Sequence, residues 1–429
     1  MRRMTFFGSL ITMALFVAGC SQPAPVPQST ATVYEGARLI VGDESAPIEN
    51  AVIVVDNGHF TAVGASGQVT VPEGAAHVSL AGKTVVPAFV DAHKHLPSGT
   101  REELVDALQH MAYYGVGATW NMGTDAGEVA LQVRNETMPN AARFRTAGRG
   151  ITAPEPGRPE IAYWIKSADE GRKAVDELAQ EKVDIVKIWV DDRDGKYKKL
   201  TPALYGSIID EAHKSNLRVT AHIFDLSDAK GLVKANLDAF AHGVRDRDID
   251  DEFVNLMKEH PNMILVPNLP DRGVAADMSW LADSVPAAEL EKIQAGFKDD
   301  PKAQQAYGIQ ARNLAKLSAA GVKISFGTDG PIPWAAHMEM ADMVAAGMTP
   351  AQVITAATKT SAELLQLADA GTVAAGKSAD FVVLDANPLD DITNSRRISA
   401  VYLRGDEVDR AGLRSRWMGG AGAAGGAAQ

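Results

Sequence analysis

The stretch VVPAFVDAHKHLPSG, from Val85 to Gly99, joins an apolar run to two histidines and then to a break. The apolar run is typical of a buried strand, and Pro97 and Gly99 mark its end. Residues two apart in a strand point to the same side, so His93 and His95 face one side at the carboxyl end of this strand. Two imidazoles at this spacing indicate a divalent-metal site.

The middle of the chain, residues 87–370, alternates apolar strands with segments of helical pattern. TPALYGSIIDEAHKSN, for example, begins with Thr201 as N-cap and Pro202 at the first helical position. Eight such units predict an α/β fold, a (β/α)₈ barrel, whose active site lies at the carboxyl ends of its strands. An open doubly wound sheet is the alternative, but no Gly-rich phosphate motif follows the first strand. The expected strands are VVPAFVDAH, VGATWNM, RFRTAG, DIVKIWV, LRVTAHIF, LDAFAHG, MILVPNL and VKISFGT.

Short β segments flank the barrel on both sides. Residues 33–86 contain alternating apolar residues around Asn57-Gly58, which is a hairpin signal. The same pattern returns in residues 371–411, so the two chain ends are expected to form one small β-sandwich. Residues 271–304 form a long insertion after the seventh strand, which we interpret as a lid.

The two ends of the chain differ from the rest. Residues 1–19 read as a signal peptide, with a positive start and an apolar stretch too short to cross a bilayer comfortably. The stretch ends in VAGC, which resembles a bacterial lipobox and implies lipidation of Cys20, the only cysteine of the chain. The alternative is a plain secretory signal with an incidental cysteine. Residues 20–32 are expected to be a linker, and residues 412–429, rich in Gly and Ala, a disordered tail.

The lipobox implies a location in the bacterial cell envelope, facing the periplasm, with the lipid anchor as the only contact with a membrane. Ser21 after the cysteine favours the outer membrane over the inner one. The net charge of −12 repels phosphate backbones and argues against a nucleic-acid partner. A small-molecule substrate is therefore expected, and assembly into a homo-oligomer stays open.

Four more polar residues lie near the carboxyl ends of expected strands. A buried charged side chain needs a partner, and a histidine in a strand is more often a hydrogen-bonded core residue than a ligand. Six polar residues at the ends of five strands are nevertheless better explained by one shared site than by six separate structural roles. The four further residues are Lys187, His222, His242 and Asp329.

The residue types suggest a division of roles. Neutral imidazoles bind zinc-like ions, and a buried lysine can lose its proton and take up carbon dioxide as a carbamate. One ion would lie among His93, His95 and Asp329, the second near His222 and His242, with carbamylated Lys187 as the bridging ligand. Asp329 would move a proton from metal-bound hydroxide to the leaving group.

This set of motifs resembles the amidohydrolase superfamily, in its binuclear, carbamylated-lysine branch. VDAHKH, VKIWVDD, TAHIFD, FAHGV and GTDG carry the resemblance, and imidazolonepropionase-related enzymes and prolidase-like dipeptidases are most similar. The resemblance implies two divalent ions, zinc by preference, and hydrolysis of an amide or peptide C–N bond in a dipeptide or N-acyl amino acid.

Several alternatives remain open. A lactonase or a deaminase could use the same scaffold, although His222-Ile-Phe-Asp225 departs from the His-x-x-Glu of deaminases. A catalytically silent binding lipoprotein is a third possibility. Arg245 is a candidate for contact with a substrate carboxylate, with an ion pair to Asp246 or Asp248 as the alternative.

Overall fold

The computed structural model describes residue 1, residues 29–158 and residues 161–424 of the chain. The predicted signal peptide, Cys20 and most of the predicted linker fall on residues 2–28, outside the described residues. Within the described ranges, no helix combines the length and the apolar character that crossing a membrane requires.

Eight parallel strands form the predicted (β/α)₈ barrel. They are β6 (Phe89–Lys94), β7 (Val116–Asn121), β8 (Arg143–Thr146), β11 (Val186–Val190), β12 (Val219–Ile223), β13 (Ala239–Phe240), β14 (Ile264–Leu265) and β15 (Lys323–Ile324). Backbone bonds beyond the strands close the barrel. The amide of Ala92 donates to the carbonyl of Phe326 (2.9 Å), and the amide of Asp184 donates to that of Thr146 (3.0 Å).

Helices follow the strands as the sequence predicts. Thr100 and Glu103 form a capping box at the start of α1, and α4 begins at Pro202 after Thr201, as expected. The barrel helices are α1 (Arg101–Tyr113), α2 (Val129–Val133), α3 (Ala168–Gln180), α4 (Pro202–Lys214), α5 (Leu226–Lys234), α6 (Asp251–Glu259), α8 (Pro301–Ala319) and α9 (Ala335–Ala345). A further helical stretch comprises α10 (Pro350–Thr355), the π turn η2 (Ala356–Thr360) and α11 (Ser361–Leu364).

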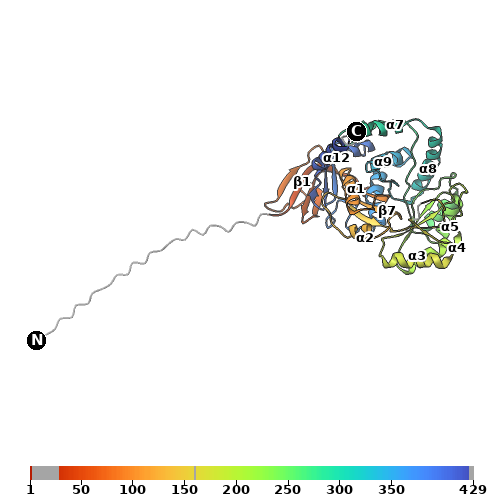
Figure 1. Cartoon of the computed structure of the whole chain (residues 1–429). Helices are drawn as coiled ribbons and strands as arrows, with labels where there is room; N and C mark the ends of the chain where they lie inside the picture. Colours follow the sequence, from red (N-terminus) through yellow and green to blue (C-terminus); the bar gives the residue numbers. More distant parts are fainter. Residues whose placement is uncertain (2–28, 159–160, 425–429) are drawn as a thin grey trace.

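The two chain ends meet in one β-sheet beside the barrel (Figure 1). Its strands are β1 (Thr32–Leu39), β2 (Ile48–Asp56), β3 (His59–Ala65), β4 (Ala76–Ser79), β5 (Thr84–Pro87), β16 (Phe381–Leu384), β17 (Ile398–Leu403) and β18 (Asp406–Glu407). β5 pairs with β16 and joins the ends. The rings of Tyr34 and Tyr402 lie 5.1 Å apart although β5 and β16 separate their strands, so the sheet curls around its own core.

The insertion after β14 is structured rather than a bare loop. It contains η1 (Ser279–Leu281), α7 (Ala287–Gly296) and the first residues of α8. Two short strands that the sequence analysis did not predict, β9 (Ile151–Thr152) and β10 (Tyr163–Trp164), extend the barrel sheet beside β11. Unlike the equally short β13, β14 and β15, neither strand lies within one of the eight apolar segments that predict the barrel strands.

The structure has a helix in the first part of the tail that the sequence predicts to be disordered. After the short helical turn η3 (Ile392–Arg396) and β17, the helix α12 covers Arg410–Ala424. Leu413 is buried, and the ring of Trp417 stacks on His110 of α1 with centroids 3.5 Å apart. These contacts stabilise a helix that the Gly-rich composition alone does not predict.

Candidate metal centre

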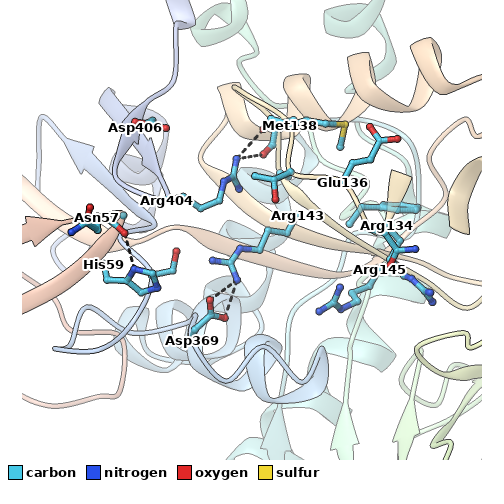
Figure 2. A pocket seen from close by; sticks show the side chains of 17 residues that line it. Asn57, His59, Arg134, Glu136, Met138, Arg143, Arg145, Asp369, Arg404 and Asp406 are labelled. Atoms are coloured by element: carbon cyan, nitrogen blue, oxygen red, sulfur yellow. Dashed lines mark hydrogen bonds and ion pairs between the residues drawn. The ribbon is translucent and has the colours of Figure 1, made fainter. Parts of the chain in front are cut away.

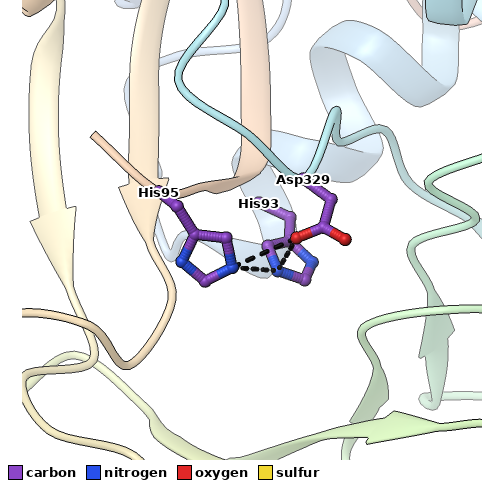
Figure 3. Close-up of side chains that lie close together, drawn as sticks. All are labelled: His93, His95 and Asp329. Carbon is purple, nitrogen blue, oxygen red and sulfur yellow. Dashed lines mark hydrogen bonds and ion pairs between the residues drawn. The ribbon is translucent and has the colours of Figure 1, made fainter. Parts of the chain in front are cut away.

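The two histidines of the opening stretch meet Asp329 at the carboxyl edge of the barrel (Figure 3). His93 and His95 lie at the end of β6, and Asp329 follows β15. His93 Nε2 lies 3.3 Å from His95 Nε2, and Asp329 Oδ1 lies 3.2 Å from the first and 3.1 Å from the second. Three potential ligand atoms thus form a nearly equilateral triangle.

The size of this triangle fits a metal ion. Zinc binds nitrogen and oxygen at about 2.0–2.2 Å, so tetrahedral ligand atoms lie about 3.3 Å from one another. The three measured separations agree with that value. The residues present therefore fit a divalent cation, held by His93, His95 and Asp329.

Neighbouring groups hold the first histidine in place. His93 Nδ1 lies 3.1 Å from the carbonyl oxygen of Ala241, and a proton on this nitrogen would leave the lone pair of Nε2 for the centre. Complete burial, together with the positive charge of Lys187, lowers the pKa of His93 to about 3. The ring is therefore neutral at physiological pH, as a metal ligand must be.

Lys187 on β11 lies directly beside this group. Its side chain is fully buried, and Nζ is 3.4 Å from His93 Nε2. Burial lowers the pKa of Lys187 to about 7. A substantial fraction of the amine is thus neutral near pH 7, which is the form that can react with carbon dioxide.

His222 on β12 and His242 after β13 lie next to each other, with ring centroids 4.5 Å apart. His242 Nε2 is 3.5 Å from Asp329 Oδ2, so this histidine borders the first group. His222 is turned elsewhere, because its Nε2 lies 2.9 Å from Asp191 Oδ2. The structure therefore brings all six predicted residues into one cluster, but only three of them converge on a common point.

Arg245 reaches the same cluster. Its charge acts on His242, His222 and Lys187, lowering the pKa of each in addition to the effect of burial. Asp246 and Asp248 are the alternative ion-pair partners considered for Arg245. They pair instead with Arg247 and Arg312, respectively. Arg245 Nε is buried and finds no hydrogen-bond partner among the described residues.

Three residues of the site escaped the sequence analysis. Asp191 and Arg193 follow β11 in a loop that reads as a solvated charge cluster, yet Asp191 contacts His222 and pairs with Arg193 (2.8 Å). The side-chain nitrogen of Asn268, after β14, lies 2.6 Å from His93 Nδ1. All three lie within three residues of the end of a barrel strand, and that position is the signal that could have identified them.

One cavity of the chain borders the metal centre, and a larger one does not. One of about 320 Å³ includes His95 in its wall, together with Trp164, Trp189 and Arg193. A larger one, of about 640 Å³, lies between the curled sheet and the barrel, away from the centre (Figure 2). Its arginines are engaged within the protein, for example Arg143 with Asp369 at 2.8 Å, so this second cavity is a structural junction.

The chain matches known proteins over most of its length. A model of the amidohydrolase family matches residues 84–408. Imidazolonepropionase of Streptomyces griseus is 25% identical and aligns over 83% of this chain and 93% of its own. A solved Bifidobacterium longum chain described as a prolidase has a TM-score of 0.74 at 25% identity, covering 91% of this chain and 100% of that one. A solved Xaa-Pro dipeptidase with bound methionine in its active site has a TM-score of 0.70 at 22% identity, covering 88% and 99%.

Proposed function

Because this chain belongs to the amidohydrolase family, we propose that it hydrolyses an amide or peptide C–N bond in a dipeptide or an N-acyl amino acid. The convergence of His93 Nε2, His95 Nε2 and Asp329 Oδ1 is the observation that carries this proposal. A divalent cation, when bound there, supplies Lewis acidity and lowers the pKa of water, to about 7 for zinc.

Asp329 is proposed as the group that moves protons. Its Oδ1 faces the two histidines of β6 and its Oδ2 faces His242, so the carboxylate lies at the middle of the cluster. From that position it accepts the proton of the attacking water and passes it to the nitrogen of the leaving group. The C–N bond breaks as this nitrogen takes up the proton, so the products are an acid and an amine.

We further propose that the centre holds two divalent ions, zinc by preference, with carbamylated Lys187 as the bridging ligand. The neutral Lys187 amine adds to carbon dioxide and releases one proton, which leaves a carboxylate at the end of the side chain. Its burial and its place 3.4 Å from His93 support this proposal. His222 and His242 would hold the second ion, and His222 would then exchange its contact with Asp191 for the ion.

Arg245 is proposed to bind the carboxylate of the substrate. Arginine pairs with carboxylates through two parallel hydrogen bonds, and the buried Nε of Arg245 still has a hydrogen bond to donate. A free carboxylate is common to dipeptides and N-acyl amino acids. This feature favours those substrates over neutral lactones.

A deaminase is disfavoured by the position of Asp225. This residue stands three after His222, where deaminases carry a glutamate, but it is the N-cap of α5 and pairs with Lys199 at 2.6 Å. A carboxylate engaged in that ion pair is not available for proton transfer at the metal centre. Hydrolysis of a C–N bond in an amide is therefore preferred to release of ammonia from a ring.

The location and the partners are proposed from the sequence. We propose that Cys20 is lipidated and anchors the protein in the cell envelope, facing the periplasm, at the outer membrane rather than the inner one. The partner is a small-molecule substrate rather than a nucleic acid. A homo-oligomer is compatible with this assignment.

Metal analysis combined with a substrate panel tests the function. The mature chain, purified with bicarbonate and without chelator, should contain about two zinc-like ions and should hydrolyse dipeptides or N-acyl amino acids. A lactone and an aminated heterocycle complete the panel. Hydrolysis of the lactone alone, release of ammonia alone, or failure to bind metal after reloading would each overturn the proposal.

A further inference from the structure

A cavity of about 240 Å³ lies against the loop that carries Asp329. Thr328, the chain neighbour of Asp329, forms part of its wall, and so does Leu269, the neighbour of Asn268. Ile332 stands in the same wall, and its carbonyl accepts a hydrogen bond of 2.8 Å from Lys94, between the two histidines of β6. The cavity thus lies beside the loops that carry the metal centre.

Much of the wall of this cavity is apolar. The rings of Phe297, from the insertion after β14, and Trp334, before α9, lie 6.4 Å apart. Ile332 is one of the few large apolar side chains of the described residues that remain exposed, with 43% of its surface accessible. The apolar wall consists of Leu269, Val274, Phe297, Ile332, Trp334 and Met338.

The carboxyl groups of the cavity are already engaged. Glu339 is buried and accepts hydrogen bonds from the amide of Leu269 with both oxygens, at 3.0 and 3.1 Å. Asp342 pairs with Arg272 at 3.1 Å. Asp271, the third carboxyl group of the wall, accepts a hydrogen bond of 2.9 Å from the amide of Gly273. The surface that the cavity offers a guest is therefore mainly apolar.

We propose that this cavity binds a large apolar side chain or acyl group of the substrate, next to the bond that is cleaved. Whole-ligand sites measure about 300–1,000 Å³, so this smaller volume suits one aliphatic or aromatic group. The insertion 271–304 then serves as a wall of the specificity pocket through Val274 and Phe297. This inference rests on the proposed hydrolysis. It adds that the preferred substrates carry a large apolar group next to the cleaved bond.

Filling the cavity from either side tests the inference. Ala335→Leu adds bulk from α9 and Ala276→Leu adds it from the insertion, since both alanines line the cavity. Ala345→Leu, at the exposed far end of α9, is the matched control. The substrates are dipeptides and N-acetyl amino acids that differ only in carrying glycine, alanine, leucine or phenylalanine on one side of the cleaved bond or the other.

In the wild-type enzyme, kcat/KM should be at least about 10-fold higher for leucine or phenylalanine than for glycine at one of the two positions, because a single methylene group in an apolar pocket changes selectivity by about 10- to 200-fold. Each filling variant should reduce this preference by about 10-fold, and Ala345→Leu should preserve it. A wild-type enzyme without preference, or filling variants that slow all substrates equally, would overturn the inference.

A binding measurement separates this inference from the proposed function. Isothermal titration compares N-acetyl-leucine with N-acetylglycine on the metal-loaded wild-type protein and on the filling variants. Tighter binding of N-acetyl-leucine that Ala335→Leu abolishes would support the pocket even if no substrate is hydrolysed, in which case the proposed reaction alone fails. Equal affinity for the two ligands, together with hydrolysis that ignores side-chain size, refutes the pocket and leaves the reaction standing.

Discussion

The ammonium of Lys94 donates a hydrogen bond of 2.9 Å to the hydroxyl of Thr328, which lies 234 residues further along the chain. That hydroxyl donates in turn to Asp91 at 2.8 Å, and the amide of Asp329 donates to the carbonyl of His93, also at 2.8 Å. The strand that carries the two histidines therefore holds the loop that carries the aspartate. These bonds keep Asp329 in a left-handed backbone conformation, with φ of 49°, which is unusual for a residue other than glycine.

We predict that Lys94→Met destabilises the protein by about 3–5 kcal/mol, because Asp91 would be left as an unpaired charge in a fully buried place. Urea unfolding of the metal-loaded protein measures this free energy. Lys234→Met, which removes an exposed ion pair with Glu252, is the control and should cost less than about 1 kcal/mol. Equal effects of the two substitutions would contradict the assigned role of Lys94.

Asp329→Asn should abolish turnover, with kcat reduced by at least about 10²- to 10⁴-fold, because an amide cannot accept the proton of the attacking water. The fold and much of the bound metal should remain, since both histidines stay in place. Steady-state kinetics, circular dichroism and metal analysis check the three points. Asp283→Asn, at an exposed position, is the matched control. Near-normal kcat in Asp329→Asn would remove this residue from the mechanism.

Lys187→Ala should lower the metal content below two ions per chain, because the bridging carboxylate is then missing. A short carboxylic acid added at high concentration should restore part of the metal and part of the activity by occupying the space of the side chain. Lys196→Ala, on the exposed loop after β11, should retain the full metal content. Unchanged metal in Lys187→Ala would refute the bridge.

His337 on α9 should make the stability of the fold depend on pH. It is buried between the hydroxyl of Ser395 and the carbonyl of Tyr114, and burial lowers its pKa to about 3. Between about pH 6.5 and pH 3 the unfolded chain binds a proton that the folded protein does not, so the free energy of unfolding falls as the pH falls, by up to about 1.4 kcal/mol per unit. Above about pH 6.5 this contribution is constant.

His337→Gln should flatten that slope. Urea unfolding of both proteins at a series of pH values between 4 and 8 measures the difference, which isolates His337 because the other histidines are common to both. Parallel curves would show that this histidine does not titrate as its surroundings imply.

Cys20→Ser should release the protein from the membrane fraction of a Gram-negative host, because the thiol is the proposed point of lipid attachment. Incorporation of labelled palmitate and flotation of membranes measure the anchor. Ser21→Ala, at the next position, should remain attached. Attachment that survives Cys20→Ser would leave only a plain secretory signal.

The eight strands of the barrel and the place of the metal centre could be predicted from the amino-acid sequence. Side chains alternate along a strand, and the carboxyl ends of parallel strands meet at one edge, so His93, His95 and Asp329 could be brought together without coordinates. The start of α4 and the turn at Asn57-Gly58 followed from local backbone preferences, and both are present.

Which three of the six clustered side chains converge, and what surrounds them, depends on the packed fold. Lys94 and Thr328, His222 and Asp191, and Trp417 and His110 are contacts between segments far apart in the chain, and hydrophobic periodicity does not encode such pairs. The helix α12 formed for the same reason, since its stability comes from packing rather than from its composition. The apolar cavity beside Asp329 exists because loops from two strands and the insertion close around one space, and that shape is a property of the packed molecule alone.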